Sequence, residues 1–209
     1  MMLILIGMDV GIGWSADANR TPVVVTEVIV FQPPRPSGVV HEGRCWTESI
    51  AVSRPGAWRC MEDNSISDPC FEVRGNLGEV VCDANPADGS AGFVMKLTES
   101  LPKPEGHPSP ESPASPWIIE LADGTLCQAA TGTMAAIGDQ AVRYPCAPPA
   151  SEGTAAHQPA IEVGVLDNLK PGKIWIADEV WFTVEATANS GSPFKLVKRK
   201  AVSVRRVWE

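Results

Sequence analysis

Six cysteines constrain this 209-residue chain more than any other feature; they are Cys45, Cys60, Cys70, Cys82, Cys127 and Cys146. Their even number and the absence of a Cys-x-x-Cys pair predict three disulfides, and therefore a secreted or cell-envelope (extracytoplasmic) protein. Structural zinc is the weaker interpretation, because a zinc knuckle takes two ligands about two to four residues apart. Here even the closest pair, Cys60 and Cys70, is separated by nine residues. Buried, reduced cysteines in a cytosolic protein are the remaining alternative.

Sequence alone does not select one pairing of six cysteines. Neighbour pairing is favoured because each pair of successive cysteines brackets a plausible turn: Cys45–Cys60, Cys70–Cys82 and Cys127–Cys146. Each disulfide would then close a loop of roughly 13–20 residues, which stabilises a fold by about 3 kcal/mol in the chain-entropy model. Cys60–Cys70 combined with Cys45–Cys82 is the main alternative.

The apolar residues recur with the character of β-strands, in segments rich in Val, Ile, Thr and Trp, and no long stretch keeps a helical period. We therefore expect an all-β protein of antiparallel, sandwich-like or barrel-like modules stapled by disulfides. The expected strands are residues 23–31, 44–52, 57–61, 79–82, 92–97, 117–121, 125–129, 141–144, 173–176, 180–186 and 194–208. Asp123-Gly124 predicts a tight hairpin in which both turn residues have positive φ.

Proline-rich residues 102–116 form the clearest boundary in the chain, and we interpret them as a linker or a long surface loop. An N-terminal β module is expected at residues 23–101, with four of the cysteines. A C-terminal β module is expected at residues 117–209, with the other two. Residues 1–22 are interpreted as a truncated signal or leader region, with a buried first strand as the equally weighted alternative.

A net charge of −8 and a pI near 4.9 argue against nucleic-acid binding, which needs a dense basic face. The longest apolar run, residues 1–8, is too short to span a membrane. Six of the 17 basic residues nevertheless fall in the last 15 positions: Lys195, Lys198, Arg199, Lys200, Arg205 and Arg206. This basic C-terminal strip indicates either contact with an anionic surface or, more simply, the solvated face of an edge strand.

Tryptophans beside the cysteines provide the candidate binding residues: Trp46, Trp58 and Arg59. Core packing against disulfides is the simpler interpretation of both tryptophans, and a sugar- or peptide-binding shelf is the functional one. The surrounding motifs are Cys45-Trp46-Thr47, Ala57-Trp58-Arg59-Cys60 and Asp68-Pro69-Cys70-Phe71. This block resembles a segment of uncharacterised bacterial secreted and envelope proteins, over about residues 43–100. The resemblance implies an extracytoplasmic, disulfide-bearing domain of unknown function.

No motif identifies catalytic residues, because the chain has no Gly-x-Ser-x-Gly elbow. The oxygen-rich group Glu62, Asp63, Asn64 and Asp68 lacks EF-hand spacing and predicts a solvated turn. We predict no metal and no cofactor. The expected role is a non-catalytic binding or structural module at the cell envelope, with an extracellular protein or glycan as partner. The alternative is a secreted hydrolase that uses paired carboxylates from Glu62, Asp63 and Asp68.

Overall fold

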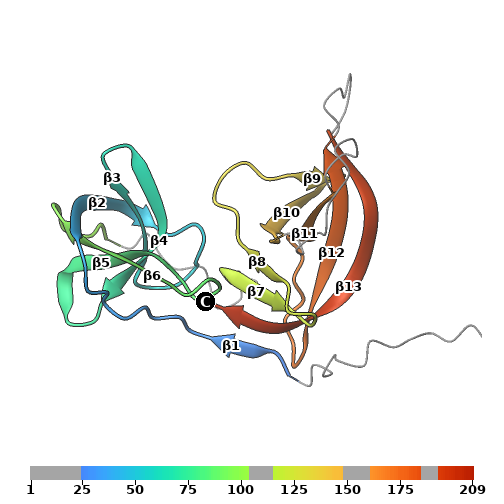
Figure 1. Ribbon diagram of the computed structural model, residues 1–209, viewed down its shortest axis with the longest axis horizontal. Helices are drawn as coiled ribbons and strands as arrows, with labels where there is room; N and C mark the ends of the chain where they lie inside the picture. Colours follow the sequence, from blue (N-terminus) through green and yellow to red (C-terminus); the bar gives the residue numbers. More distant parts are fainter. Residues whose placement is uncertain (1–24, 104–114, 148–160, 185–192) are drawn as a thin grey trace, which may run out of the picture.

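A computed structural model describes residues 25–103, 115–147, 161–184 and 193–209, and these residues form an all-β structure (Figure 1). This confirms the expected fold class. A closed barrel and a larger curled sheet lie next to each other. The expected leader at residues 1–22, and residues 104–114 of the proline-rich segment, lie outside the described residues. Within the described ranges no helix is long and apolar enough to cross a membrane.

Five successive strands form the barrel, and each is antiparallel to the next. They are β2 (Val40–Glu48), β3 (Ala57–Glu62), β4 (Ser65–Val73), β5 (Asn76–Asn85) and β6 (Ser90–Leu97). The first and last strands, β2 and β6, pair in parallel and close the barrel. Because each strand pairs with the next one in the sequence, the barrel is a simple meander.

Two disulfides lie inside the barrel and link directly opposed residues of neighbouring strands. Cys45–Cys60 joins β2 to β3, and Cys70–Cys82 joins β4 to β5. The sulfur-bearing side chains pack with Trp58, Val80 and Met95. The neighbour pairing is therefore confirmed, and the alternative bond between Cys60 and Cys70 does not form.

The larger sheet has the strand order β8-β7-β13-β12-β11-β10-β9. Its strands are β7 (Ile118–Leu121), β8 (Leu126–Gln128), β9 (Ala136–Ile137), β10 (Gln140–Pro145), β11 (Ile161–Leu166), β12 (Trp175–Val184) and β13 (Phe194–Trp208). The long β13 curves along the whole sheet (Figure 1). It pairs with β12 over its first part and with β7 over its last part. The third predicted disulfide, Cys127–Cys146, ties β8 to the end of β10, so the sheet curls onto itself.

The barrel and the sheet share one apolar core. Phe71 of the barrel, Trp117 next to the sheet and Phe31 between them have ring centroids 5.6–5.8 Å apart. The same cluster continues through the sheet to Trp208. Strand β1 (Glu27–Ile29) falls in the range expected for the N-terminal module, yet it pairs in parallel with the end of β13. The two parts are thus joined by a strand as well as by side chains.

Candidate binding groove

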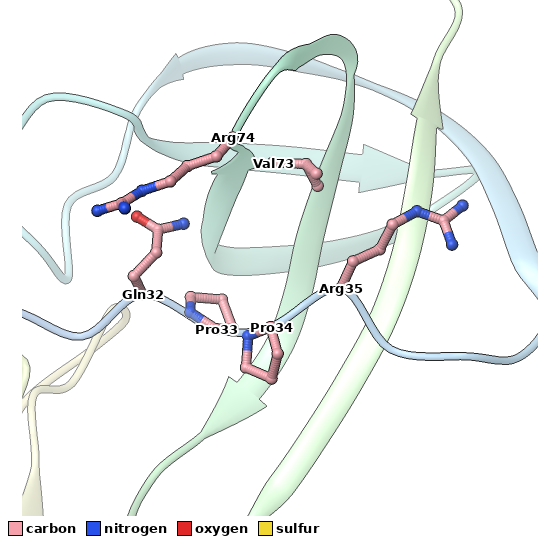
Figure 2. Close-up of a pocket in the computed structure, with 6 residues that line it drawn as sticks. All are labelled: Gln32, Pro33, Pro34, Arg35, Val73 and Arg74. Atoms are coloured by element: carbon pink, nitrogen blue, oxygen red, sulfur yellow. The ribbon is translucent and has the colours of Figure 1, made fainter.

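The chain that leaves β1 crosses the barrel as an extended strap, residues 32–35, which Figure 2 shows beside the β4–β5 hairpin. Its two prolines lack N–H groups and cannot donate hydrogen bonds to a β-ladder. Side chains hold the strap instead. The Gln32 Nε2 donates to the Glu72 carbonyl at 2.9 Å, and the Arg35 guanidinium forms two bonds to the Glu79 carboxylate, at 2.8 and 3.2 Å. This ion pair holds the pKa of Glu79 below its ordinary value.

Space remains between the strap and the hairpin. Two adjoining cavities of about 480 and 350 Å³ share Gln32, Val73 and Arg74 in their walls. We call this continuous depression the strap groove. Its remaining lining residues are Pro33, Pro34 and Arg35 of the strap, Pro55, Gly56 and Trp58 at the start of β3, and Glu72, Gly75 and Leu77 of the β4–β5 hairpin. Each cavity has the volume typical of a ligand pocket.

Arg74 supplies the free positive charge of the groove. It lies in the two-residue turn between β4 and β5, where Gly75 takes the positive φ of 79° that the turn requires. The Arg74 side chain extends beside the Gln32 amide, whereas that of Arg35 points away from them (Figure 2) and bonds to Glu79 of β5. Arg74 has no ion pair within the described part of the chain, whereas Arg35 is neutralised by Glu79. An anionic ligand would therefore meet one uncommitted guanidinium here.

The groove wall combines a buried tryptophan, the Glu72 carboxylate and an exposed leucine. Trp58 is 3% exposed, and its Nε1 donates to Glu72 Oε1 at 2.8 Å. That bond occupies one oxygen of the Glu72 carboxylate. Leu77 at the rim is 80% exposed, so an apolar side chain of a ligand can be covered there.

The predicted binding residues separate onto two faces of the barrel wall. Trp58 is a core residue whose edge lines the strap groove. Arg59 is its neighbour in the strand and points to the other side, where its guanidinium lies over the Trp46 ring, 5.6 Å from the centroid. The structure thus brings Trp46 and Arg59 together and places Trp58 elsewhere. The simpler interpretation, core packing against disulfides, describes Trp58 but not the 38%-exposed Trp46.

The three carboxylates suggested for hydrolysis differ in their position and in their hydrogen-bond partners. Glu62 is bonded to His41 Nδ1 at 2.8 and 2.9 Å, and Asp63 occupies the β3–β4 turn with a φ of 49°. The side chain of Asp68 is 3% exposed and accepts bonds from the Ser49 hydroxyl and the Ile50 N–H. The oxygen-rich segment that contains them is the β3–β4 hairpin.

The basic C-terminal strip is largely neutralised within the molecule. Four of its residues form ion pairs: Arg199 with Asp178, Lys200 with Glu179, Arg205 with Glu120, and Arg206 with Glu27 and Glu120. The Lys198 ammonium lies over the Trp181 ring, 4.8 Å from the centroid. The strip therefore consists mainly of intramolecular pairs along β13, which favours the interpretation of a solvated strand face.

The sequence did not identify Gln32 and Arg74 as site residues. The only available signal is the Pro33-Pro34 pair, which disfavours a regular strand but does not show that this segment lies beside the turn containing Arg74. Comparison of the chain with protein families, with characterised proteins and with solved structures gives no match.

Proposed function

We propose that this protein is a non-catalytic binding module that acts outside the cytoplasm and holds an extended, acidic segment of an envelope or extracellular protein in the strap groove. The observation that carries the proposal is the unpaired Arg74 guanidinium, set between two adjoining cavities. A planar guanidinium binds a carboxylate through two parallel hydrogen bonds.

The shape of the groove favours an extended peptide. Its two cavities follow one another across Gln32, Val73 and Arg74, which suits a ligand longer than it is wide. Exposed Leu77 on the hairpin and exposed Pro34 on the strap offer apolar contacts. A peptide with alternating acidic and apolar side chains matches this pattern.

The setting of the carboxylates supports binding rather than hydrolysis. Glycoside hydrolysis needs two carboxyl groups that face one substrate. Glu62 is bonded to His41. Asp68 lines a separate cavity of about 190 Å³ with Asp83 and Asp88, but its oxygens accept hydrogen bonds from Ser49 and Ile50. Neither carboxylate lines the strap groove.

The three disulfides support a location outside the cytoplasm. Thiol alkylation of the denatured, secreted protein followed by intact-mass measurement tests this location. We expect no labels without reductant and six with it. Six labels without reductant would exclude an oxidising compartment.

Fluorescence polarisation with a labelled octapeptide of alternating Glu and Leu tests the groove. We expect saturable binding that falls at least about tenfold in Arg74→Glu, because a hydrogen bond to a charged group contributes about 1.5–3 kcal/mol. Arg44→Glu is the matched control, since Arg44 is exposed on β2 and lies outside the groove lining.

Three outcomes would count against the proposal. They are no binding of the acidic peptide, equal binding of an octapeptide of alternating Lys and Leu, and an equal loss of affinity in Arg44→Glu. Binding of an acidic oligosaccharide in place of the peptide would assign the groove to a glycan.

A further inference from the structure

The Cys127–Cys146 disulfide differs from the two barrel disulfides in its access to solvent. All four barrel cysteines are buried, with 0–6% exposure. Cys127 is also buried, at 1%, but its partner Cys146 is only partly buried and stands between the exposed residues Pro145 and Ala147. A thiol in solution can therefore approach this disulfide from the Cys146 side alone.

A cavity of about 370 Å³ leads to this disulfide at the junction of the barrel and the sheet. The sheet side of the cavity contains Cys127, Cys146, Leu126 and Pro145. The barrel side contains Asn85 at the end of β5, with Ala87 and Asp88 of the turn that follows it. We call it the junction cavity; it shares no lining residue with the strap groove. Its volume is ample for a small thiol.

The junction cavity has a negative electrostatic character. Asp88 is the one charged residue among its described lining residues. Its Oδ1 accepts the Ser90 N–H at 2.8 Å, and the described residues place no cation against it. A smaller adjoining cavity of about 190 Å³ is lined by Asp68 and Asp83 in addition to Asp88. A cationic thiol is attracted to this site, and an anionic one is repelled.

We propose that Cys146 is a thiol-exchange site for small aminothiols. The thiolate of the aminothiol attacks Cys146 Sγ, forms a mixed disulfide there and breaks the bond to Cys127. The electron pair leaves on Cys127, which takes a proton from solvent and becomes a buried thiol. A second thiol, or Cys127 itself, reverses the modification.

The surrounding backbone keeps the sheet closed while the disulfide is open. Ala147 N–H donates to the Leu126 carbonyl at 3.1 Å, and Ala130 N–H donates to the Arg143 carbonyl at 2.9 Å. Exchange can therefore proceed on the folded protein, and it changes the junction cavity without dismantling the barrel.

The test uses folded protein with cysteamine as the cationic thiol and mercaptoacetate as the anionic thiol, followed by alkylation and peptide mass mapping. We expect a cysteamine adduct on Cys146, an alkylated Cys127 and intact barrel disulfides. After normalisation to the rates with a neutral small-molecule disulfide, cysteamine should react faster than mercaptoacetate by about three- to tenfold at low salt. Asp88→Asn should abolish this preference, whereas the control Asp63→Asn, on the distant β3–β4 hairpin, should keep it.

If the disulfide opens slowly, single-cysteine variants test the accessibility of each sulfur separately. Cys127→Ser leaves a free thiol at Cys146, which should react rapidly with cystamine, whereas the Cys127 thiol in Cys146→Ser should stay protected. An adduct on Cys127, reduction of the barrel disulfides at the same rate, or a charge preference that survives Asp88→Asn would overturn the proposal.

Discussion

At the scale of single residues, Asp68 shows how burial can oppose a charge that the surroundings only partly stabilise. Its carboxylate is 3% exposed and accepts bonds from Ser49 and Ile50, but the Arg59 Nε is 3.9 Å away, too far for a hydrogen bond. Loss of hydration is therefore the largest influence, and it raises the pKa of Asp68 above its ordinary value.

The raised pKa predicts how stability changes with pH. The unfolded chain releases the Asp68 proton first, so the contribution of Asp68 to folding is most favourable below about pH 4 and is lost as the pH rises toward the folded-state pKa. Asp68→Asn should remove this trend. Urea unfolding of both proteins from pH 3 to 7 should show the wild type losing free energy of unfolding relative to the variant. A difference that is constant across this range would contradict the assignment.

Residue-level reasoning from sequence worked for the disulfides but not for the groove. The cysteine pairs could be predicted because the two members of each pair are close in sequence and lie on neighbouring strands or bridged residues. Two pairs join strands that are consecutive in the barrel, and the third joins residues linked by an isolated β-bridge. Arg74 and Gln32 are distant in sequence, and their proximity depends on how β1 joins the sheet. No local pattern encodes that arrangement.

At the scale of elements, the strands missed from sequence had interrupted patterns. Pro69 lies inside β4, where a proline ordinarily argues against a strand, and Gly164 interrupts β11. The expected strands 173–176 and 180–186 are one strand, β12, because the polar residues between them pair with β13. The Asp123-Gly124 hairpin forms, but Gly124 alone has a positive φ of 87°, because the turn is longer than a two-residue loop.

The β5–β6 hairpin depends on close contact at Gly92. A Cβ at this position would lie 2.1 Å from the Cys82 carbonyl oxygen, and the backbone has a φ of 67°. Gly92→Ala should therefore lower the free energy of unfolding by more than about 3 kcal/mol. Gly89→Ala is the matched control, because Gly89 has a φ of 75° but open space around it, and it should cost about 1 kcal/mol. Equal losses in denaturant unfolding would show that the contact is unimportant.

At the scale of the whole molecule, the shared core implies that the barrel and the sheet depend on each other. Phe71 and Trp117 belong to different parts but to one buried cluster, and β1 ties the strap to the end of β13. The sequence predicted two modules because its proline-rich segment resembles a linker. It could not reveal a common core, since packing between distant segments leaves no local pattern.

This shared core predicts one cooperative unfolding transition. Met95→Ala removes a fully buried side chain from the barrel and should cost about 2–5 kcal/mol. Calorimetry should show a single peak in both proteins, and in the variant the whole peak should move to lower temperature. A peak that splits, with one part remaining at the wild-type temperature, would mean that the sheet unfolds independently of the barrel.

The central claim is that the strap groove binds an acidic peptide, and the indole resonance of Trp58 tests it most directly. Its N–H donates to Glu72 inside the groove, so an occupant must alter its environment. In a ¹⁵N-labelled sample titrated with the Glu–Leu octapeptide, we predict shifts of the Trp58 indole and the Gln32 side-chain amide, with the Trp181 indole unchanged. Binding that moves Trp181 and leaves Trp58 and Gln32 in place would contradict the account.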